Sequence, residues 1–373
     1  MFTGGASSTA TFTVKQQQAR SLIALEGDTD RNRFVVSSLD LRGDNEVSVL
    51  EFNEDTNELS CQSVFAHPQE VWHSVSCPAP EHAELICTTF STGSEMRSKV
   101  WRMDTASAGA SADGGAAAPL QELVQLGEGV PLREHLGVVW NAVLPEQIIT
   151  LTKQRLALAT LTHGARASTA AETATAAPPI DGAAFSCARW DPHHAHSLGV
   201  GCTTGAIVSL DTRTMKPSHS LADAHTQRVR GVDYNPNRPY VVLSCGDDYA
   251  MRYWDVRKPG ASLLSVKAHA HWTTAALYNR FHDQLVLSTG TDYRIKLWRA
   301  ASVSSAPPSA EADEAELSEA EADGLVKAYD DHESSVFSAA WSAADAWIFA
   351  SLSLDGKVVV NHVPPAEKYR ILL

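Results

Sequence analysis

The strongest constraint on the fold is a repeat with a period of 44 residues in the second half of the chain. Five identical residues recur at this offset: His225 and His269, Asn235 and Asn279, Ser244 and Ser288, Asp248 and Asp292, and Trp254 and Trp298. The same offset applied backwards places Asp211 before Asp255 and Arg213 before Arg257, so a weaker third copy precedes the two clear ones. Self-similarity at a fixed period indicates that one supersecondary unit is built several times and stacked on its neighbours.

Each copy has short apolar segments separated by turn residues. In the copy that begins at Ala224, VRGVDYNP predicts a strand ending in an Asn-Pro turn, YVVLSCG a second strand and AMRYWD a third. A repeat of ~40 to 45 residues with this pattern is typical of a WD40 blade, which is a four-stranded sheet. Seven such blades plus insertions account for all 373 residues. We therefore predict an all-β, seven-bladed WD40 β-propeller that occupies residues 1–373 as one domain.

The same template places the other blades and the segments between them. The predicted blades cover residues 20–52, 67–102, 135–161, 182–213, 225–257, 269–300 and 332–363. A single strand at residues 10–14 is expected to complete the last blade beside KVVVNHV, because closing the ring removes the open sheet edges. Three inserts, at residues 105–119, 163–179 and 301–323, have little to bury and are predicted to be disordered loops.

The third insert differs from the other two in its charge. Seven acidic residues lie between Glu311 and Asp323, and they contribute half of the formal net charge of −14. A run of this kind can be a solvated surface segment, can dock on a basic partner, or can carry regulatory phosphates at Ser309 or Ser318. The sequence leaves these alternatives open.

The recurring polar residues predict a hydrogen-bonded network inside the blades. The pattern resembles that of WD repeats, which link a His ahead of the first strand, a Ser or Thr on the second, an Asp in the tight turn and a Trp on the third. The residues that fit are His225, Ser244, Asp248 and Trp254, then His269, Ser288, Asp292 and Trp298, then His332, Ser351 and Asp355. Asn361 stands where the last Trp is expected, so we expect an incomplete network in the seventh blade.

A set of Ser, His and Asp could also form a hydrolytic triad. A triad is needed once, whereas this set recurs in several blades, which favours the structural role. The sequence contains no GxSxG elbow, Walker loop or HExxH motif. The run DPHHAH at residues 191–196 follows a strand without a second ligand cluster at a defined spacing, so a solvated loop is favoured over a metal site. We predict no enzymatic activity, no cofactor and no metal.

Charge and cysteine content restrict the partners and the compartment. The net charge of −14, with no basic stripe, argues against a nucleic-acid partner. The six cysteines have no CxxC spacing and lie mostly in apolar runs, which indicates reduced thiols and a cytosolic protein. Neither a signal peptide nor a stretch of 18 apolar residues is present, so we expect no direct membrane insertion.

A partner-binding face can be predicted from the positions three and five residues after each repeat His. By the two-residue period of a strand these positions share one face, near the start of the innermost strand. The candidate residues are Glu70, Trp72, Arg228, Arg230, Trp272 and Phe337, with Thr274 and Ser335 at the equivalent positions. Aromatic residues and arginine are typical of interface hot spots. The aromatic residues could instead pack between blades, and the sequence leaves both interpretations open.

Longer motifs resemble one particular family. EVWHSVSCP at 70–78, RWDPHH at 189–194, YNPNRPYVVLSCGDD at 234–248, YNRFHDQLVLS at 278–288 and the ending KYRILL are similar to the EARP and GARP complex-interacting protein family. The chain departs from that pattern in its Ala-rich inserts, in a degenerate third blade and at Trp298-Arg299, where the usual Asp is absent.

The resemblance implies a role in membrane traffic. Members of the family bind the endosomal and Golgi tethering complexes and support endosomal recycling, retrograde transport and dense-core vesicle maturation. By this resemblance we expect a cytoplasmic scaffold, associated peripherally with the trans-Golgi network and endosomes, and a monomer within a larger complex. The resemblance carries over no specific contact residues.

Two other functions stay open. Trp254-Asp255-Val256-Arg257 resembles the WDxR box of substrate receptors in cullin-RING ubiquitin ligases, with Asp255 and Arg257 as adaptor contacts. A WD pair followed by a basic residue is also common at blade ends without that role. The second alternative is a propeller-type peroxisomal import receptor, which would bind a basic amphipathic helix on an acidic face.

Overall fold

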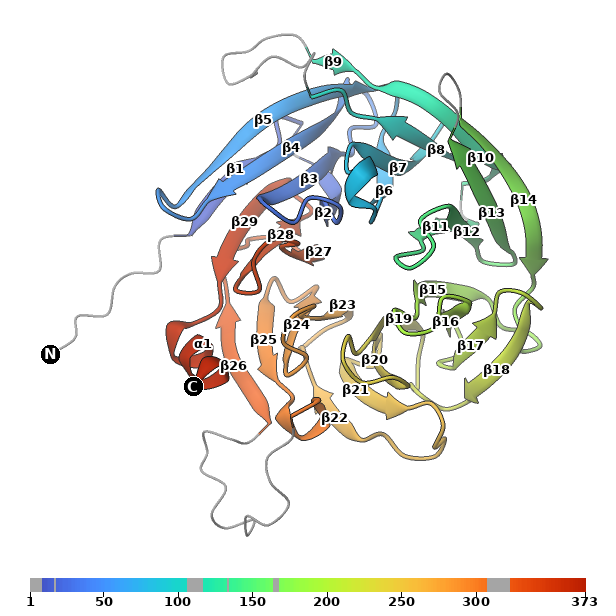
Figure 1. Cartoon of the computed structure of the whole chain (residues 1–373), viewed down its shortest axis with the longest axis vertical. Helices are drawn as coiled ribbons and strands as arrows, with labels where there is room; N and C mark the ends of the chain where they lie inside the picture. The colour runs from blue at the N-terminus through green and yellow to red at the C-terminus, as the bar shows by residue number, and fades with distance from the viewer. Residues whose placement is uncertain (1–8, 17, 106–116, 133, 164–167, 307–322) are drawn as a thin grey trace, which may run out of the picture.

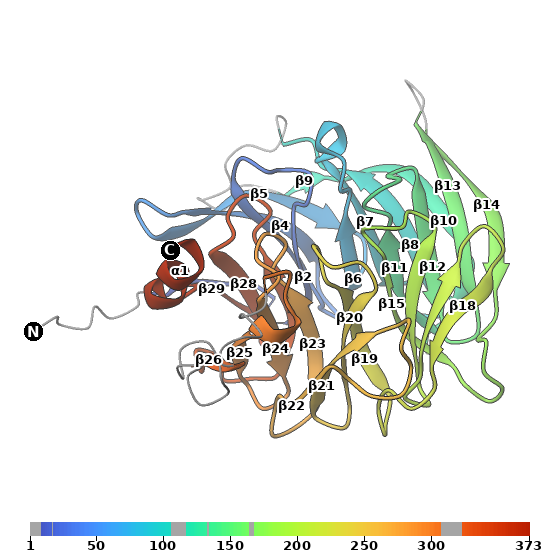
Figure 2. The same cartoon turned by 60° about the horizontal axis from the view of Figure 1, so that its bottom comes forward.

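Six four-stranded sheets and one five-stranded sheet are arranged in a ring around a central axis (Figure 1). The structure is a computed structural model that describes residues 9–16, 18–105, 117–132, 134–163, 168–306 and 323–373. The prediction of a seven-bladed WD40 β-propeller is confirmed. Figure 2 shows the ring turned toward its edge, with the blades standing side by side.

Each blade is built from antiparallel strands that follow one another in the chain. The first strand lies nearest the axis, and each later strand lies farther out (Figure 1). The innermost strands are β2 (Ala19–Ala24), β6 (Val71–Ser76), β11 (His135–Trp140), β15 (Phe185–Trp190), β19 (Val229–Tyr234), β23 (Thr273–Tyr278) and β27 (Val336–Trp341). The second strands are β3 (Asn32–Ser38), β7 (Leu85–Ser91), β12 (Gln147–Thr152), β16 (Ser197–Cys202), β20 (Val241–Gly246), β24 (Leu285–Gly290) and β28 (Ile348–Ser353). The third strands are β4 (Asn45–Asn53), β8 (Glu95–Arg102), β13 (Leu156–His163), β17 (Ile207–Asp211), β21 (Ala250–Asp255), β25 (Ile295–Arg299) and β29 (Lys357–His362).

The outer strands complete the blades. They are β5 (Glu58–His67), β10 (Gln121–Pro131), β14 (Ser168–Ala176), β18 (Lys216–Leu221), β22 (Leu264–Lys267), β26 (Gly324–Tyr329) and, in the last blade, β1 (Ala10–Thr13). The short strand β9 (Ala118–Pro119) pairs in parallel with β5. The described residues also form two 3-10 helices, η1 (Pro80–His82) and η3 (Ala301–Val303), and one α-helix, α1 (Pro365–Leu372), at the outer edge of the ring near β26 (Figure 1).

Burial explains why the strands differ in composition. Second strands such as β20 (VVLSCG) and β28 (IFASLS) are buried at every residue, because neighbouring blades cover both of their faces. Outer strands are more exposed: β22 (LSVK) alternates between partly buried and exposed residues, and four of the six residues of β18 (KPSHSL) are exposed. The core therefore lies in seams between adjacent blades.

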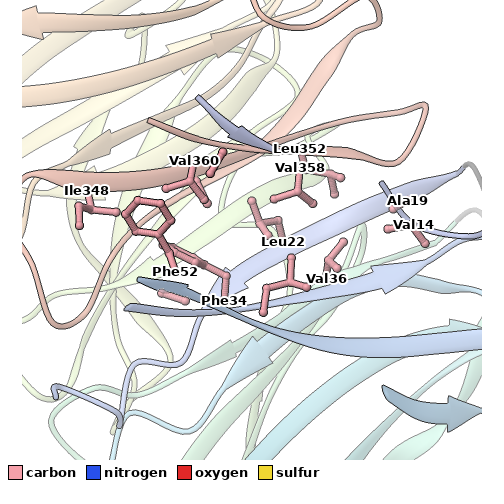
Figure 3. Close-up of a cluster of buried hydrophobic side chains, with 14 residues drawn as sticks. Val14, Ala19, Leu22, Phe34, Val36, Phe52, Ile348, Leu352, Val358 and Val360 are labelled. Carbon is pink, nitrogen blue, oxygen red and sulfur yellow. The ribbon is translucent and has the colours of Figure 1, made fainter. Parts of the chain in front are cut away.

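The ring closes through a strand exchange between the two ends of the chain. Ala10 of β1 pairs with Val360 of β29, and Thr13 pairs with Lys357, which confirms the predicted closure by the N-terminal strand. The seam beneath this closure packs Leu22 and Phe34 of the first blade against Ile348 and Val358 of the last (Figure 3). β1 thereby covers the edge of β29.

Two predictions about the blade boundaries are wrong. The predicted ranges of the first six blades end at the third strand and leave out the outer strands, which lack an apolar run that would mark them. The insert 163–179 was expected to be disordered, but residues 168–176 form β14, which pairs with β13 from Leu156↔Ala176 to His163↔Ser168. A strand with one solvated face does not need large apolar residues, so an Ala- and Thr-rich segment suffices.

The other two inserts are described only at their ends. Residues 118 and 119 of the first predicted insert form β9, contrary to the prediction of a loop. Residues 301–303 of the third insert form η3. The remaining parts of the predicted disorder, at residues 106–116, 164–167 and 307–322, lie outside the described residues.

Candidate functional site

The polar network of the fifth blade joins the four residues that share the repeat. His225 Nδ1 lies 2.8 Å from Asp248 Oδ1, and His225 Nε2 lies 2.8 Å from Ser244 Oγ. The Trp254 indole donates to Ser244 Oγ over 2.9 Å. Because an indole N–H can only donate and a carboxylate can only accept, Ser244 accepts from Trp254, and His225 Nδ1 donates to Asp248. Burial opposes ionisation of Asp248, but bonds from His225 and Arg252 outweigh it and hold the pKa of that carboxyl below its usual range.

The sixth blade repeats this geometry. His269 bonds Asp292 and Ser288 over 2.8 Å each, and the Trp298 indole donates to Ser288 over 2.8 Å. Burial raises the pKa of Asp292. Hydrogen bonds from His269 and the Ala270 backbone outweigh this effect and lower the pKa to about 2. The polar side chains of this network therefore bond one another within the blade, as a stabilising network requires.

The seventh blade has a different network. His332 Nε2 contacts Ser351 over 2.9 Å, but Nδ1 contacts Ser353 over 2.7 Å, and Ser353 in turn bonds Asp355. Asp355 therefore reaches the histidine through a serine. Asn361 replaces the Trp, and neither polar atom of its buried side chain has a hydrogen-bond partner among the described residues.

A fourth network, in the second blade, was not predicted. His67 Nε2 contacts Thr88 Oγ1 over 3.0 Å, and the Trp101 indole donates to Thr88 over 2.8 Å. The His–hydroxyl separation is 21 residues here against 19 in the fifth blade, and the hydroxyl–Trp separation is 13 against 10. A search at one fixed offset misses this copy, whereas a search that tolerates longer turns would find it.

The predicted partner-binding residues lie together where the innermost strands begin, on a side that we call the start face. Five of the six line one cavity of about 910 Å³, to which all seven innermost strands contribute; they are Glu70, Trp72, Arg228, Arg230 and Phe337. Trp272 does not line the cavity but stands beside it, 41% exposed, with the Arg230 guanidinium carbon 5.2 Å from its ring centre. Thr274, at an equivalent position, also lines the cavity.

Arg20 is a member of this site that sequence reasoning missed. Its guanidinium carbon lies 5.4 Å from the ring centre of Trp72 and 5.0 Å from that of Phe337, so it packs between two predicted residues. Both contacts have cation–π geometry. The 44-residue offset does not extend to the first blade, and no repeat His precedes Arg20 to mark its position.

The opposite end of the channel, which we call the end face, has paired charges. A cavity of about 370 Å³ is lined there by residues at the ends of the innermost strands, including Arg189, Asp233 and Arg280. Arg189 Nε donates to Asp233 over 3.0 Å, and Arg280 forms an ion pair with Glu26. The two arginines that line this cavity therefore have acidic partners.

The histidine-rich run at residues 191–196 takes part in turn and interblade contacts. Asp191 accepts from the His193 backbone N–H and bonds the His194 ring, each over 2.8 Å, and the His193 ring contacts the Asn235 carbonyl over 2.8 Å. Within the described ranges, no group of three or more His, Cys, Asp or Glu side chains is placed to hold a metal ion.

Of the four WDxR residues, Trp254, Asp255 and Val256 are buried, and Arg257 is exposed at the surface of the fifth blade. Arg257 donates to both carboxylate oxygens of Asp255, over 2.9 and 2.8 Å, and its side chain is 53% exposed. Its guanidinium carbon also lies 4.7 Å from the Tyr240 ring centre. Asp211 and Arg213 form the same pair in the fourth blade, so the arrangement is a repeated feature of the blade ends.

The ring of seven sheets and the repeated His–Ser–Asp–Trp networks define a WD40-type β-propeller protein. Residues 324–360 match the family model described as "WD domain, G-beta repeat". Residues 6–298 match the model described as "EIPR1 beta-propeller". The chain belongs to this EIPR1 β-propeller family.

Curated relatives cover nearly the whole chain. The "EARP-interacting protein homolog" of Gekko japonicus is 32% identical over 378 residues, which cover 95% of this chain and 97% of the relative. The "EARP and GARP complex-interacting protein 1" of Homo sapiens is 31% identical with the same coverage. The "WD repeat-containing protein DWA2" of Arabidopsis thaliana is 32% identical over 356 residues, or 93% of this chain and 95% of the relative.

In the part of the chain that the structure describes, no helix is long and apolar enough to cross a membrane.

Proposed function

We propose that this chain is a non-catalytic adaptor that binds the EARP and GARP tethering complexes through its start face. The observation that carries the proposal is the similarity to relatives named for interaction with these complexes, at 31–32% identity over 95% of the chain. The geometry supports it, because the Ser, His and Asp groups that could suggest catalysis are bound to one another inside the blades.

The cellular role follows from the proposed partners. An adaptor for these complexes would act in endosomal recycling, retrograde transport and dense-core vesicle maturation, and would associate peripherally with endosomes and the trans-Golgi network. Its contact with membranes would run through the tethering complex.

Affinity purification from the protein's own cells tests the proposal. The tagged chain is recovered after detergent-free lysis and the bound proteins are quantified by mass spectrometry, with the tag alone as control. We expect tethering-complex subunits in near-stoichiometric amounts. Recovery of cullin-ligase components without any tether subunit would overturn the adaptor assignment.

A matched pair of variants tests which face is used. Trp272 and Phe281 belong to the same blade and are 41% and 47% exposed, but Trp272 stands at the start face and Phe281 follows the end of β23. Loss of a hot-spot aromatic costs about 2 kcal/mol or more of binding free energy, which is roughly a 30-fold loss of affinity. We expect Trp272→Ala to reduce tether recovery accordingly, whereas Phe281→Ala leaves it unchanged. The reverse result would place the contact on the end face.

The second candidate function is a substrate receptor of a cullin-RING ligase. The observation that favours it is the exposure of Arg257, which Asp255 orients at the surface. The test is co-purification of the ligase adaptor with the wild type and its loss in Arg257→Ala. Arg213→Ala is the matched control, because Arg213 has the same pairing in the neighbouring blade. Equal adaptor recovery from both variants would remove this candidate.

A further inference from the structure

Three arginines meet at the start face, and only one of them has an acidic partner. Arg230 Nε donates to Asp247 over 2.6 Å. Neither Arg20 nor Arg228 makes an ion pair among the described residues, although both line the cavity with Arg230. Glu70 also lines this cavity, and it too is without an ion pair within the described ranges. The start face thus differs from the end face, where Arg189 and Arg280 are paired.

The positive charges of neighbouring arginines lower the pKa values of Arg20 and Arg228. Burial, followed by the charges of Arg230 and Arg228, lowers the pKa of Arg20. Burial and the charge of Arg230 lower the pKa of Arg228, although Asp247 acts in the opposite direction. The protein therefore gathers positive charge in a part-buried mouth while the chain as a whole carries −14. Such a mouth focuses an attractive potential on anionic groups.

Four residues that line the same cavity each carry a buried polar atom without a hydrogen-bond partner among the described residues. Arg228 Nε, Trp72 Nε1, His135 Nδ1 and Ser186 Oγ are buried and make no hydrogen bond within the described residues, and all four residues line the mouth. Burial, with a further contribution from the neighbouring charge of Arg20, lowers the pKa of His73 to about 4. Burial and then His73 lower the pKa of His135 to about 4. At neutral pH these rings are uncharged and offer hydrogen bonds only.

We propose that the start-face mouth binds an acidic peptide segment of a partner protein, with side-chain carboxylates held by Arg20 and Arg228. This inference deepens the proposed adaptor function and rests on it. Guanidinium groups pair with carboxylates through two parallel hydrogen bonds, and the indole of Trp72 can donate a further one. Burial of the three arginines in a shared mouth also makes the interaction less sensitive to salt than a surface pair.

Several features favour a peptide over other anions. A cavity of about 910 Å³ is far larger than one carboxylate, and exposed Trp272 beside it offers an apolar contact that a peptide side chain can use. A nucleic acid is disfavoured, because it needs an extended basic surface and this chain is strongly acidic.

The described residues on either side of the acidic insert lie at the other end of the channel from the mouth. Ser305, just before the undescribed residues, bonds Asp283, and Asp283 accepts from Asn235 at the end of β19. Asp323, just after them, bonds Ser302. Both described flanks therefore lie toward the end face, which favours an occupant from another chain.

Binding of a defined probe tests the inference. The probe is a short fluorescein-labelled peptide of alternating glutamate and glycine, acetylated and amidated, titrated by fluorescence anisotropy with the full chain. We expect binding by the wild type and a loss of at least tenfold, or about 1.4 kcal/mol, in Arg20→Gln and in Arg228→Gln. Arg280→Gln is the matched control, since it removes one positive charge at the other end of the same channel. Thermal unfolding checks that the variants are folded, and Arg20→Lys, which keeps the charge, should retain part of the binding.

Two control ligands show whether the site recognises side-chain carboxylates. The glutamine version of the peptide and a thymidine oligonucleotide should not bind. The inference is overturned if the wild type does not bind the glutamate peptide, if Arg20→Gln and Arg228→Gln bind as tightly as Arg280→Gln, or if only the oligonucleotide binds. It is also overturned if binding requires a free C-terminal carboxylate in place of the side chains.

The purification experiment separates this inference from the proposed function. If Arg228→Gln recovers tether subunits in wild-type amounts, the adaptor function stands and the acidic-peptide site does not serve it. If the wild type binds the peptide through these arginines but recovers no tether subunit, the site stands and the proposed partner is wrong.

Discussion

Arg299, the last residue of β25, forms a buried ion pair with Glu367 of α1. The Arg299 Nε donates to Glu367 Oε1 over 2.7 Å, and the two side chains are only 11% and 3% exposed. Arg299 directly follows Trp298, where the repeat has Asp255 after Trp254 in the preceding blade. The missing Asp is thus replaced by a basic residue that anchors the C-terminal helix to the sixth blade.

Breaking this pair should destabilise the protein strongly. We expect Glu367→Gln to lower the free energy of unfolding by about 3 kcal/mol, because the part-buried charge of Arg299 would lose the carboxylate of Glu367. Urea denaturation measures the difference. Arg370 also contacts Glu367 but is 40% exposed, so Arg370→Gln should cost less than about 1 kcal/mol. Equal losses in the two variants would show that burial of the Arg299 pair is not decisive.

The hydroxyl of Ser244 joins two buried groups, so its removal should be costly. Ser244→Ala leaves the Trp254 indole and the His225 ring without this partner, and we expect a loss of about 2 kcal/mol in unfolding free energy. Ser351→Ala is the matched control, because Asn361 replaces the Trp of that blade and one fewer donor is orphaned. A loss in Ser351→Ala as large as in Ser244→Ala would contradict the role assigned to the indole.

Buried histidines should make the protein less stable in mild acid. Burial, with a smaller effect of Lys357, lowers the pKa of His332 to about 4, against an ordinary value of 6.5. Between these two values the unfolded chain binds a proton at this ring and the folded protein does not. The free energy of unfolding therefore falls as the pH falls from 6.5 toward 4, by up to about 1.4 kcal/mol per pH unit for each such histidine.

Burial likewise lowers the pKa of His67 to about 4, so its effect adds in the same pH range. Urea denaturation at about pH 7, 6 and 5 measures the slope. His332→Gln should reduce that slope by the contribution of one histidine, whatever it does to the stability at pH 7. An unchanged slope would exclude His332 as a source of the acid sensitivity.

Removal of the closing strand should open the ring. Deletion of residues 1–14 removes β1 and exposes the edge of β29, together with part of the seam that Leu22 and Val358 share. We expect lower stability and self-association, because an uncovered strand edge is a template for pairing. Deletion of residues 1–8 keeps β1 and is the control. Light scattering and urea denaturation compare the two, and a monomeric, equally stable protein without β1 would contradict this prediction.

The sequence predicted the fold where the repeat is regular. The fifth and sixth blades have His, Ser, Asp and Trp at one offset, and these residues form the same hydrogen bonds in both. Outer strands such as β14 could not be recognised, because a strand with one solvated face needs no apolar pattern.

The candidate site was predicted only in part, for two physical reasons. Positions counted from a repeat His located Trp72, Arg228 and Phe337, since every innermost strand presents the same positions to the channel. Arg20 comes from a blade without that His, and its place between two aromatic rings depends on blades that are distant in sequence. Similarly, the route from His332 to Asp355 depends on Ser353, whose rotamer no spacing can reveal.

The strand exchange that closes the ring also sets an order of events during synthesis. Ala10 leaves the ribosome 350 residues before its partner Val360. Until then the first blade has no neighbour on one side, and the seam that holds Phe34 and Ile348 cannot form. Contacts between such distant residues form slowly. The nascent chain therefore exposes apolar surface for most of its translation, and we expect it to depend on chaperones more than its final compactness would indicate.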